Sequence, residues 1–179
     1  RPQARFVVTL DISARLMDDL LHGNLDLIIA GSPGYSIPEA EIRPVAQETL
    51  HAVVRAGHPL LKSSSTTNDL AKARWMLPAP RRIMRRWIED ALHELGLPPP
   101  RIALETDSTL ALLNPMLRDS DLVGVMTRRM LASPAGSGLR ALDRLIPSRS
   151  DVLVAMWRRD SYLSPLIIDF RDAVLQAEG

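Results

Sequence analysis

Hydroxyl side chains that stand between a predicted strand and a predicted helix are the groups of this sequence best suited to bind a ligand. The residues at such places are Ser13, Ser108 or Thr109, and Thr127. In an open parallel sheet these positions lie at the carboxyl ends of strands, which is where such sheets bind ligands. The helix that begins there offers free N–H donors and a partial positive charge, so the position suits a carboxylate or a phosphate.

The same hydroxyls also have a purely structural interpretation. Serine and threonine are preferred at helix N-caps in proteins of every kind, so each of them alone is more often a cap than a ligand contact. Several of them at strand ends favour a binding cleft over a set of unrelated caps. Both interpretations stay open at this point.

Patterns for catalysis or metal binding are missing from the sequence. It has no cysteine, and its histidines lack the spacing of a metal site; they are His22, His51, His58 and His93. It contains no GxGxxG, P-loop or GxSxG motif, and no predicted strand leads into Gly136-Ser137-Gly138. We therefore expect no enzyme activity, no metal and no cofactor.

A dense group of arginines marks the start of one predicted helix. Its members are Arg81, Arg82, Arg85 and Arg86. Because the helix dipole disfavours positive charge at this end, the placement needs an explanation. A solvated or partner-facing helix is the first interpretation, steering of an anionic effector the second, and contact with DNA the third.

Alternating strands and helices predict an α/β fold. The predicted strands are Phe6–Leu10, Leu25–Ala30, Ile42–Gln47, Thr49–Arg55, Trp75–Leu77, Ile102–Glu105, Leu122–Met126 and Val152–Trp157. Helices are predicted around Leu16–Leu21, from Ile83 to Leu95, over Thr109–Arg118 with a kink or restart at Pro115, and over Leu163–Gln176. The first strand, helix and second strand read as one βαβ unit with parallel strands. Polar stretches interrupt the pattern near residues 65 and 135, and Lys62–Asn68 is a candidate boundary or linker.

Length and composition fit one domain or two small lobes. The chain has 179 residues and is nearly neutral, with 22 Lys and Arg against 21 Asp and Glu, so it has little electrostatic reason to bind DNA by itself. No apolar run approaches the roughly 20 residues of a membrane span. Residues 1–5 lack the apolar stretch of a signal peptide, and we expect a cytoplasmic protein.

Four segments carry a recognisable pattern, in a fixed order and spacing. Within Arg5–Gly31 a strand and a small polar turn precede LLHGNLDLII, and Val53–Leu60 reads VVRAGHPL. Further on, Asp69-Leu70 is followed by Trp75–Pro78, and Leu122–Met126 reads LVGVM. Together these segments resemble the effector-binding domain of LysR-type bacterial transcriptional regulators.

The resemblance implies a type 2 periplasmic-binding-protein-like α/β fold, with two Rossmann-like lobes joined by two crossover strands. Lobe I would comprise residues 1–56 and 143–179, and lobe II residues 57–142. The winged helix-turn-helix of the family, through which it binds DNA, is absent from these residues, and so are the first strand and helix of lobe I. The sequence also departs from the family in having Thr127-Arg128 where Leu-Pro is common.

The resemblance further implies an effector-sensing function. A small, anionic metabolite, such as a carboxylate or a sugar acid, would bind between the lobes and control transcription. Carried over from the family, the contacts would be hydrogen-bonding and shape-setting residues at strand ends: Ser13, Ser32, Pro33, Pro78, Ala79, Pro80, Thr109 and Thr127.

Family members pair these domains antiparallel, which implies a homodimer or tetramer. The residues expected near the contact between copies are Leu16, Leu20, Leu21, Arg82, Arg86 and Trp87. Two other functions are compatible with the same fold. A periplasmic solute-binding protein would need a signal peptide, and an enzyme would need a general base or a phosphate-binding site in the cleft.

Overall fold

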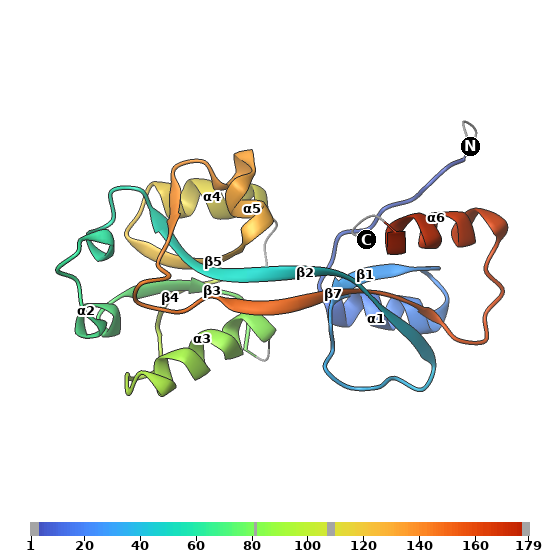
Figure 1. Ribbon diagram of the computed structural model, residues 1–179, viewed down its shortest axis with the longest axis horizontal. Helices are drawn as coiled ribbons and strands as arrows, with labels where there is room; N and C mark the ends of the chain where they lie inside the picture. The colour runs from blue at the N-terminus through green and yellow to red at the C-terminus, as the bar shows by residue number, and fades with distance from the viewer. Residues whose placement is uncertain (1–3, 81, 107–109, 177–179) are drawn as a thin grey trace. The chain divides into compact units, whose positions relative to one another are not determined.

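Two long strands, β2 (Ala40–Arg55) and β7 (Arg149–Arg158), carry the chain between two units of structure. The computed structural model describes residues 4–80, 82–106 and 110–176. Unit 1 comprises Arg1–Gln47 and Asp151–Gly179, and unit 2 comprises Glu48–Ser150 (Figure 1). Lys62–Asn68 lies inside unit 2, where Arg144 donates hydrogen bonds to the carbonyls of Lys62 and Ser65 at 2.7 and 3.0 Å.

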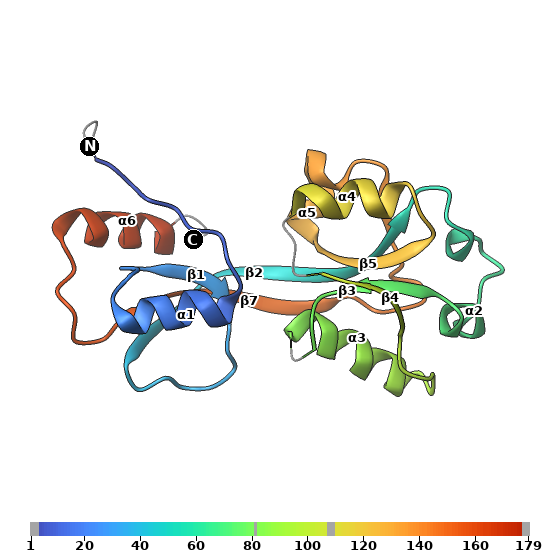
Figure 2. The same ribbon diagram turned by 180° about the vertical axis from the view of Figure 1, so that it is seen from behind.

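Unit 1 contains helix α1 (Ser13–His22) and strands in which β7 lies between β1 (Ile28–Gly31) and β2 in the strand order. Strand β1 pairs antiparallel with β7, and α1 lies beside β1 (Figure 2). The small core consists of Leu20, Ile28, Ala30, Val154 and Met156. As the sequence predicts, α1 ends at a glycine: Gly23 has a φ of 84°, in the left-handed region that glycine adopts without strain.

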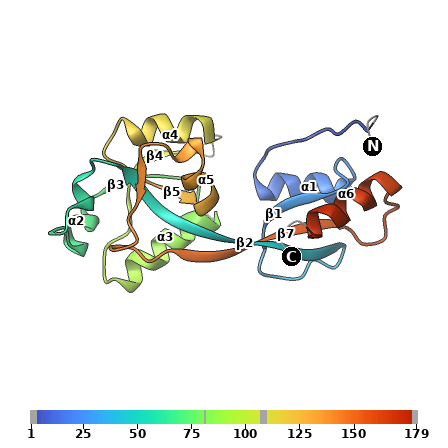
Figure 3. The same ribbon diagram turned by 45° about the horizontal axis from the view of Figure 1, so that its top comes forward.

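The predicted strand at Phe6–Leu10 is not formed. These residues have no strand assignment and no ladder partner among the residues that the structure describes, and the ribbon before α1 is drawn without a strand arrow (Figure 3). Val7, Val8 and Leu10 are about four-fifths exposed. The predicted βαβ unit is therefore wrong as well, because β1 pairs with the distant β7 instead of a parallel neighbour. A β-branched run forms a strand only where a neighbouring strand accepts its hydrogen bonds.

Unit 2 contains a mixed sheet in the order β4–β3–β5–β2, with β6 (Leu139–Ala141) also on β2. Strand β3 (Arg74–Leu77) runs parallel to β4 (Arg101–Glu105) and to β5 (Leu122–Thr127), whereas β2 runs antiparallel to β5. The expected parallel arrangement thus applies to three strands. The prediction of two strands over 42–55 is wrong, because β2 is continuous from Ala40 to Arg55.

Helices cover both faces of this sheet (Figures 1 and 2). Helix α3 (Ile83–Glu94) buries its predicted stripe, including Ile88 and Leu92, against the larger core around Trp75. On the other face lie α4 (Leu110–Arg118) and α5 (Arg128–Ala132), and Leu117 of α4 is fully buried there. Helix α4 runs through Pro115 without a restart.

The remaining helices are peripheral. Short 3-10 turns η1 (Pro59–Leu61) and η2 (Pro134–Gly136) shape the loops of unit 2, and α6 (Pro165–Gln176) ends unit 1 without a buried residue. Helix α2 (Thr67–Ala71) begins with a capping box, in which the carboxylate of Asp69 accepts the backbone N–H of Thr66 at 3.0 Å. This hydrogen bond to the charged form lowers the pKa of Asp69 below its ordinary value.

Candidate functional site

The carboxyl ends of three parallel strands meet at one edge of unit 2. Strands β3, β4 and β5 end at Leu77, Glu105 and Thr127, and they run in the same direction. The backbone N–H of Thr106 donates to the carbonyl of Leu77 at 3.1 Å, which joins the ends of β3 and β4. Pro78, Ala79 and Pro80 continue directly from β3, so the structure brings them to the same edge as Thr127.

Arg85 fixes this edge. Its side chain is only 12% exposed, and its guanidinium lies 3.4 Å from the carbonyl of Pro78, as a donor, and 3.7 Å from the carboxylate of Glu105. It also pairs with Glu89 one helical turn along, at 2.6 Å. One arginine of the predicted basic group therefore serves to hold strand ends in place. Arg86 is exposed, and Arg81 lies outside the described residues.

Thr127 is the predicted helix cap that the structure confirms. It stands at the N-cap of α5, and its Oγ1 accepts the backbone N–H of Met130 at 3.2 Å. The residue as a whole is half-buried, and its hydroxyl caps the helix that begins at this edge.

Next to Thr127 lie ionisable residues that the sequence did not single out as site residues. Leu50 of β2 is the ladder partner of Thr127, and its neighbours Glu48 and His51 are buried, with exposures of 6% and 7%. The Glu48 carboxylate lies 3.6 Å from Nε of Arg129, and Nδ1 of His51 lies 2.7 Å from Oδ1 of Asp143. The two partners of each pair are far apart in the chain, so no local sequence spacing predicts either pair.

The predicted contacts of unit 1 lie at the start of helix α1 and in the loop that follows β1. Ser13 is exposed and is the first residue of α1, but Ile12 occupies the N-cap and no side chain caps the helix. The expected capping role of Ser13 is therefore wrong. Ser32 directly follows β1. Its backbone N–H donates to the carbonyl of Val152 at 2.8 Å, and its hydroxyl accepts the backbone N–H of Gly34 at 3.3 Å. Pro33 is half-buried between them.

Thr109, like the alternative Ser108, lies outside the described residues. The nearby Asn114 of α4 has a structural role: its amide donates to the carbonyls of Ala135 and Ser137 at 2.6 and 3.0 Å. This contact ties α4 to the turn that follows α5.

The residues expected between two copies fall into two groups. Leu20 and Trp87 are 0% and 6% exposed, and they pack in the cores of unit 1 and unit 2. Leu21 and Arg86 face solvent, while Leu16 and Arg82 are half-buried. Of these six residues, only Leu16, Leu21, Arg82 and Arg86 have side chains accessible to another copy, whereas Leu20 and Trp87 are core residues.

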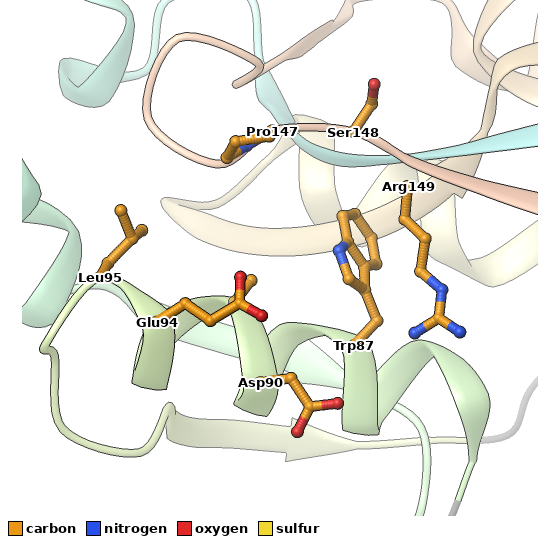
Figure 4. Close-up of a pocket in the computed structure, with 8 residues that line it drawn as sticks. Trp87, Asp90, Glu94, Leu95, Pro147, Ser148 and Arg149 are labelled. Atoms are coloured by element: carbon orange, nitrogen blue, oxygen red, sulfur yellow. The ribbon is translucent and has the colours of Figure 1, made fainter.

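A separate pocket of about 530 Å³ lies in unit 2 between α3 and the segment that leads into β7 (Figure 4). Trp87, Leu95 and Pro147 supply apolar surface, and Asp90, Glu94 and Arg149 supply charge; Ala91 and Ser148 complete the lining. None of the predicted effector contacts lines this pocket, and its two carboxylates disfavour an anion.

Among the described residues, no cluster of three or more histidine and carboxylate side chains could hold a metal ion. Within the same ranges, no helix combines the length and the apolar character that crossing a membrane requires.

The comparisons with known proteins agree with this architecture. The family model for the LysR substrate binding domain matches residues 1–179. The chain is 25% identical over 177 residues to the HTH-type transcriptional regulator GalR of Pseudomonas putida. The aligned region covers 98% of this chain and 44% of that protein. The chain thus spans less than half the length of this relative.

Two solved structures have a similar fold. One is the effector binding domain of QuiR in complex with shikimate, with a TM-score of 0.73, 21% identity, and coverage of 93% of this chain and 78% of that one. The other is the regulatory domain of CcmR from Synechocystis PCC6803 in complex with 2-PG, with a TM-score of 0.72, 18% identity, and coverage of 91% and 78%.

The predicted fold class is confirmed as the type 2 periplasmic-binding-protein-like fold of these domains. The family is one of transcriptional regulators and is not an enzyme family. By its match over the whole length and by its α/β architecture, this chain belongs to the LysR family and is a LysR substrate-binding domain.

Proposed function

We propose that this chain is the effector-sensing part of a bacterial, cytoplasmic LysR-type transcriptional regulator, and that it binds a small, anionic metabolite between two lobes. The lobes are residues 1–56 with 143–179, and residues 57–142. Binding would favour one arrangement of lobes or subunits and so alter how the regulator sits on DNA through an N-terminal domain. A ligand shifts such a balance only by its difference in affinity between the two states.

The observation that carries the proposal is the carboxyl edge of unit 2. Pro78, Ala79 and Pro80 follow β3 at the edge where Thr127 ends β5. Ser13, Ser32 and Pro33 of unit 1 supply the opposing contacts in this proposal, and Thr109 adds one from the start of α4. All of them act by hydrogen bonding or shape, and none as a catalyst.

An anionic effector fits two independent facts. The exposed Arg128 follows Thr127 directly, whereas the next residue, Arg129, is paired with the Glu48 carboxylate at 3.6 Å. One structurally similar domain is complexed with shikimate, which is a carboxylate. A periplasmic solute-binding protein is not favoured, because the matched family and the curated relative are regulators.

The proposed regulator works as a homodimer or tetramer. Solvent-facing residues of α1 and α3, Leu21 and Arg86 with the half-buried Leu16 and Arg82, would meet in an antiparallel contact between copies. Leu20 and Trp87 would set the shape of these two helix surfaces from the cores below.

A thermal-shift screen of carboxylates and sugar acids tests the proposed effector class. A specific effector at about 100 times its dissociation constant stabilises the folded protein by about 2.7 kcal/mol, so at least one anion should raise the melting temperature by several degrees. Uncharged analogues of each hit, an amide or a parent sugar, should give no comparable rise. If neutral sugars or amines stabilise the protein and no anion does, the effector class is wrong.

A further inference from the structure

The pocket between α3 and the segment that leads into β7 is separate from the proposed effector site. Its lining residues come from positions 87–95 and 147–149, which all belong to unit 2 and lie far along the chain from both ends of the sequence. Its volume of about 530 Å³ is typical of sites for small molecules. None of the residues proposed to contact the effector lines it, so a ligand in this pocket would be a second ligand.

Two carboxylates stand on the pocket side of α3. Asp90 and Glu94 are one helical turn apart, and both are exposed. Neither carboxylate has an ion pair or a hydrogen bond within the ranges that the structure describes. Like charges at this spacing repel each other, and the helix dipole disfavours a negative charge at Glu94, the last residue of α3. A bound cation would offset both effects.

Trp87 adds a hydrogen-bond donor that no protein group uses. The residue lines the pocket and is only 6% exposed, and its Nε1 has no acceptor among the described residues. Figure 4 shows the ring nitrogen on the side of the ring that faces Glu94. A buried indole N–H usually has a partner, so this donor favours a ligand that brings an acceptor into the pocket.

Arg149 supplies positive charge to the same pocket. It is the first residue of β7 and is half-buried, and in the described part of the chain its guanidinium has no ion pair. In Figure 4 the Trp87 ring lies between the side chains of Arg149 and Glu94. An unpaired guanidinium that is partly shielded from water favours a carboxylate. The lining therefore suits a ligand that carries both signs of charge, with one more positive group than negative.

We propose that this pocket binds a basic amino acid, which has two cationic groups and one carboxylate. The two cations would pair with Asp90 and Glu94, and the carboxylate would accept the N–H of Trp87 while Arg149 balances its charge. The methylene groups of the side chain would lie on the apolar part of the lining. An anionic metabolite would meet two carboxylates here, and a diamine would leave Arg149 and the Trp87 N–H without a partner.

NMR spectra of the indole N–H groups test this site directly, because the chain has only three tryptophans. Trp87→Phe identifies the signal of Trp87 by its loss. In the wild type, L-arginine should shift that signal saturably, with a Kd below about 1 mM, and leave the signals of Trp75 and Trp157 in place. No saturable shift of the Trp87 signal up to about 10 mM L-arginine would overturn the proposal, and so would an equal shift with sodium chloride at the same ionic strength.

Two analogues of L-arginine test the two kinds of charge separately. L-Citrulline keeps the shape of L-arginine without the cationic guanidinium, and agmatine lacks only the carboxylate. Each should bind roughly tenfold more weakly than L-arginine or worse, since each loses a hydrogen-bonded charged group. Equal affinity for the three compounds would overturn the proposed recognition.

Neutral variants of the lining residues assign the binding to this pocket. Asp90→Asn/Glu94→Gln and Arg149→Gln should each weaken L-arginine binding roughly tenfold. Because both carboxylates are exposed, the double variant should keep the melting temperature of the wild type.

Asp119→Asn is the matched control, since it removes an exposed carboxylate of unit 2 that does not line the pocket, and it should bind L-arginine as the wild type does. The opposite pattern would overturn the proposal: wild-type affinity in the pocket variants, with binding lost in Thr127→Ala, would place L-arginine at the proposed effector site.

Discussion

Gly136→Ala should lower the free energy of unfolding by about 3 kcal/mol, the upper part of the range for overpacking a well-ordered site. A Cβ atom at this position would lie 2.1 Å from the carbonyl oxygen of Leu131 and 2.5 Å from its carbonyl carbon and Cα. Relief requires the backbone of α5 or of the turn η2 to move. That movement would disturb the hydrogen bonds from Gly136 N–H to Ser133 and from Asn114 to Ala135.

Urea unfolding followed by circular dichroism measures this loss, and Gly57→Ala is its control. A Cβ at Gly57 would meet only the end of the Arg55 side chain, at 2.8 Å, and moving that end disturbs no more than its ion pair with the exposed Asp121. The control should therefore stay within about 1 kcal/mol of the wild type, as surface substitutions usually do. Equal losses for the two alanine variants would mean that the turn after α5 is not packed against Leu131.

Leu20→Ala should destabilise unit 1 by about 3 kcal/mol, within the range of 2 to 5 for a leucine in a core. Leu20 is fully buried and is one of only five buried residues in its cluster, so the cavity it leaves has little around it that can collapse. Leu21 follows on the same helix but is 38% exposed, and Leu21→Ala should change the free energy of unfolding by less than about 1 kcal/mol.

The two leucines also separate stability from association. Chemical denaturation gives the stability of both variants, and sedimentation of the folded proteins gives their assembly. Leu21→Ala should affect only assembly, if the helix contact between copies forms. A loss of stability for Leu21→Ala as large as that for Leu20→Ala would contradict the assigned burial of α1.

Elements with a strong local pattern could be predicted from the sequence. The apolar stripe of α3 and the glycine after α1 define helices whose ends need no distant partner. Strands β3 and β5 are short apolar runs between turn residues, and they occur where the pattern indicates; β7 contains the predicted run Val152–Trp157 but begins earlier, at Arg149. The failure at Phe6–Leu10 has a physical cause, because its composition suits a strand but the ladder that would hold it depends on a neighbour that composition does not reveal.

Which strands pair with each other could not be predicted from local sequence patterns either, for the same reason. The antiparallel ladder of β1 with β7 joins residues more than a hundred positions apart, and β2 is a single strand because it continues from one unit into the other. At the candidate site, Thr127 was predictable as a helix cap from its place between a strand and a helix. The pairs of the buried Glu48 with Arg129 and of the buried His51 with Asp143 were not, since these partners are far apart in the sequence.

The central claim is that residues of both units contact one effector, and calorimetric titration of two single variants tests it most directly. With the best anion from the thermal screen, Ser13→Ala and Thr127→Ala should each weaken binding roughly tenfold, the loss expected when a hydrogen bond to a charged ligand is removed. Thr127→Ser, which keeps the hydroxyl that caps α5, should bind nearly as the wild type does. Wild-type affinity in both alanine variants would contradict the account.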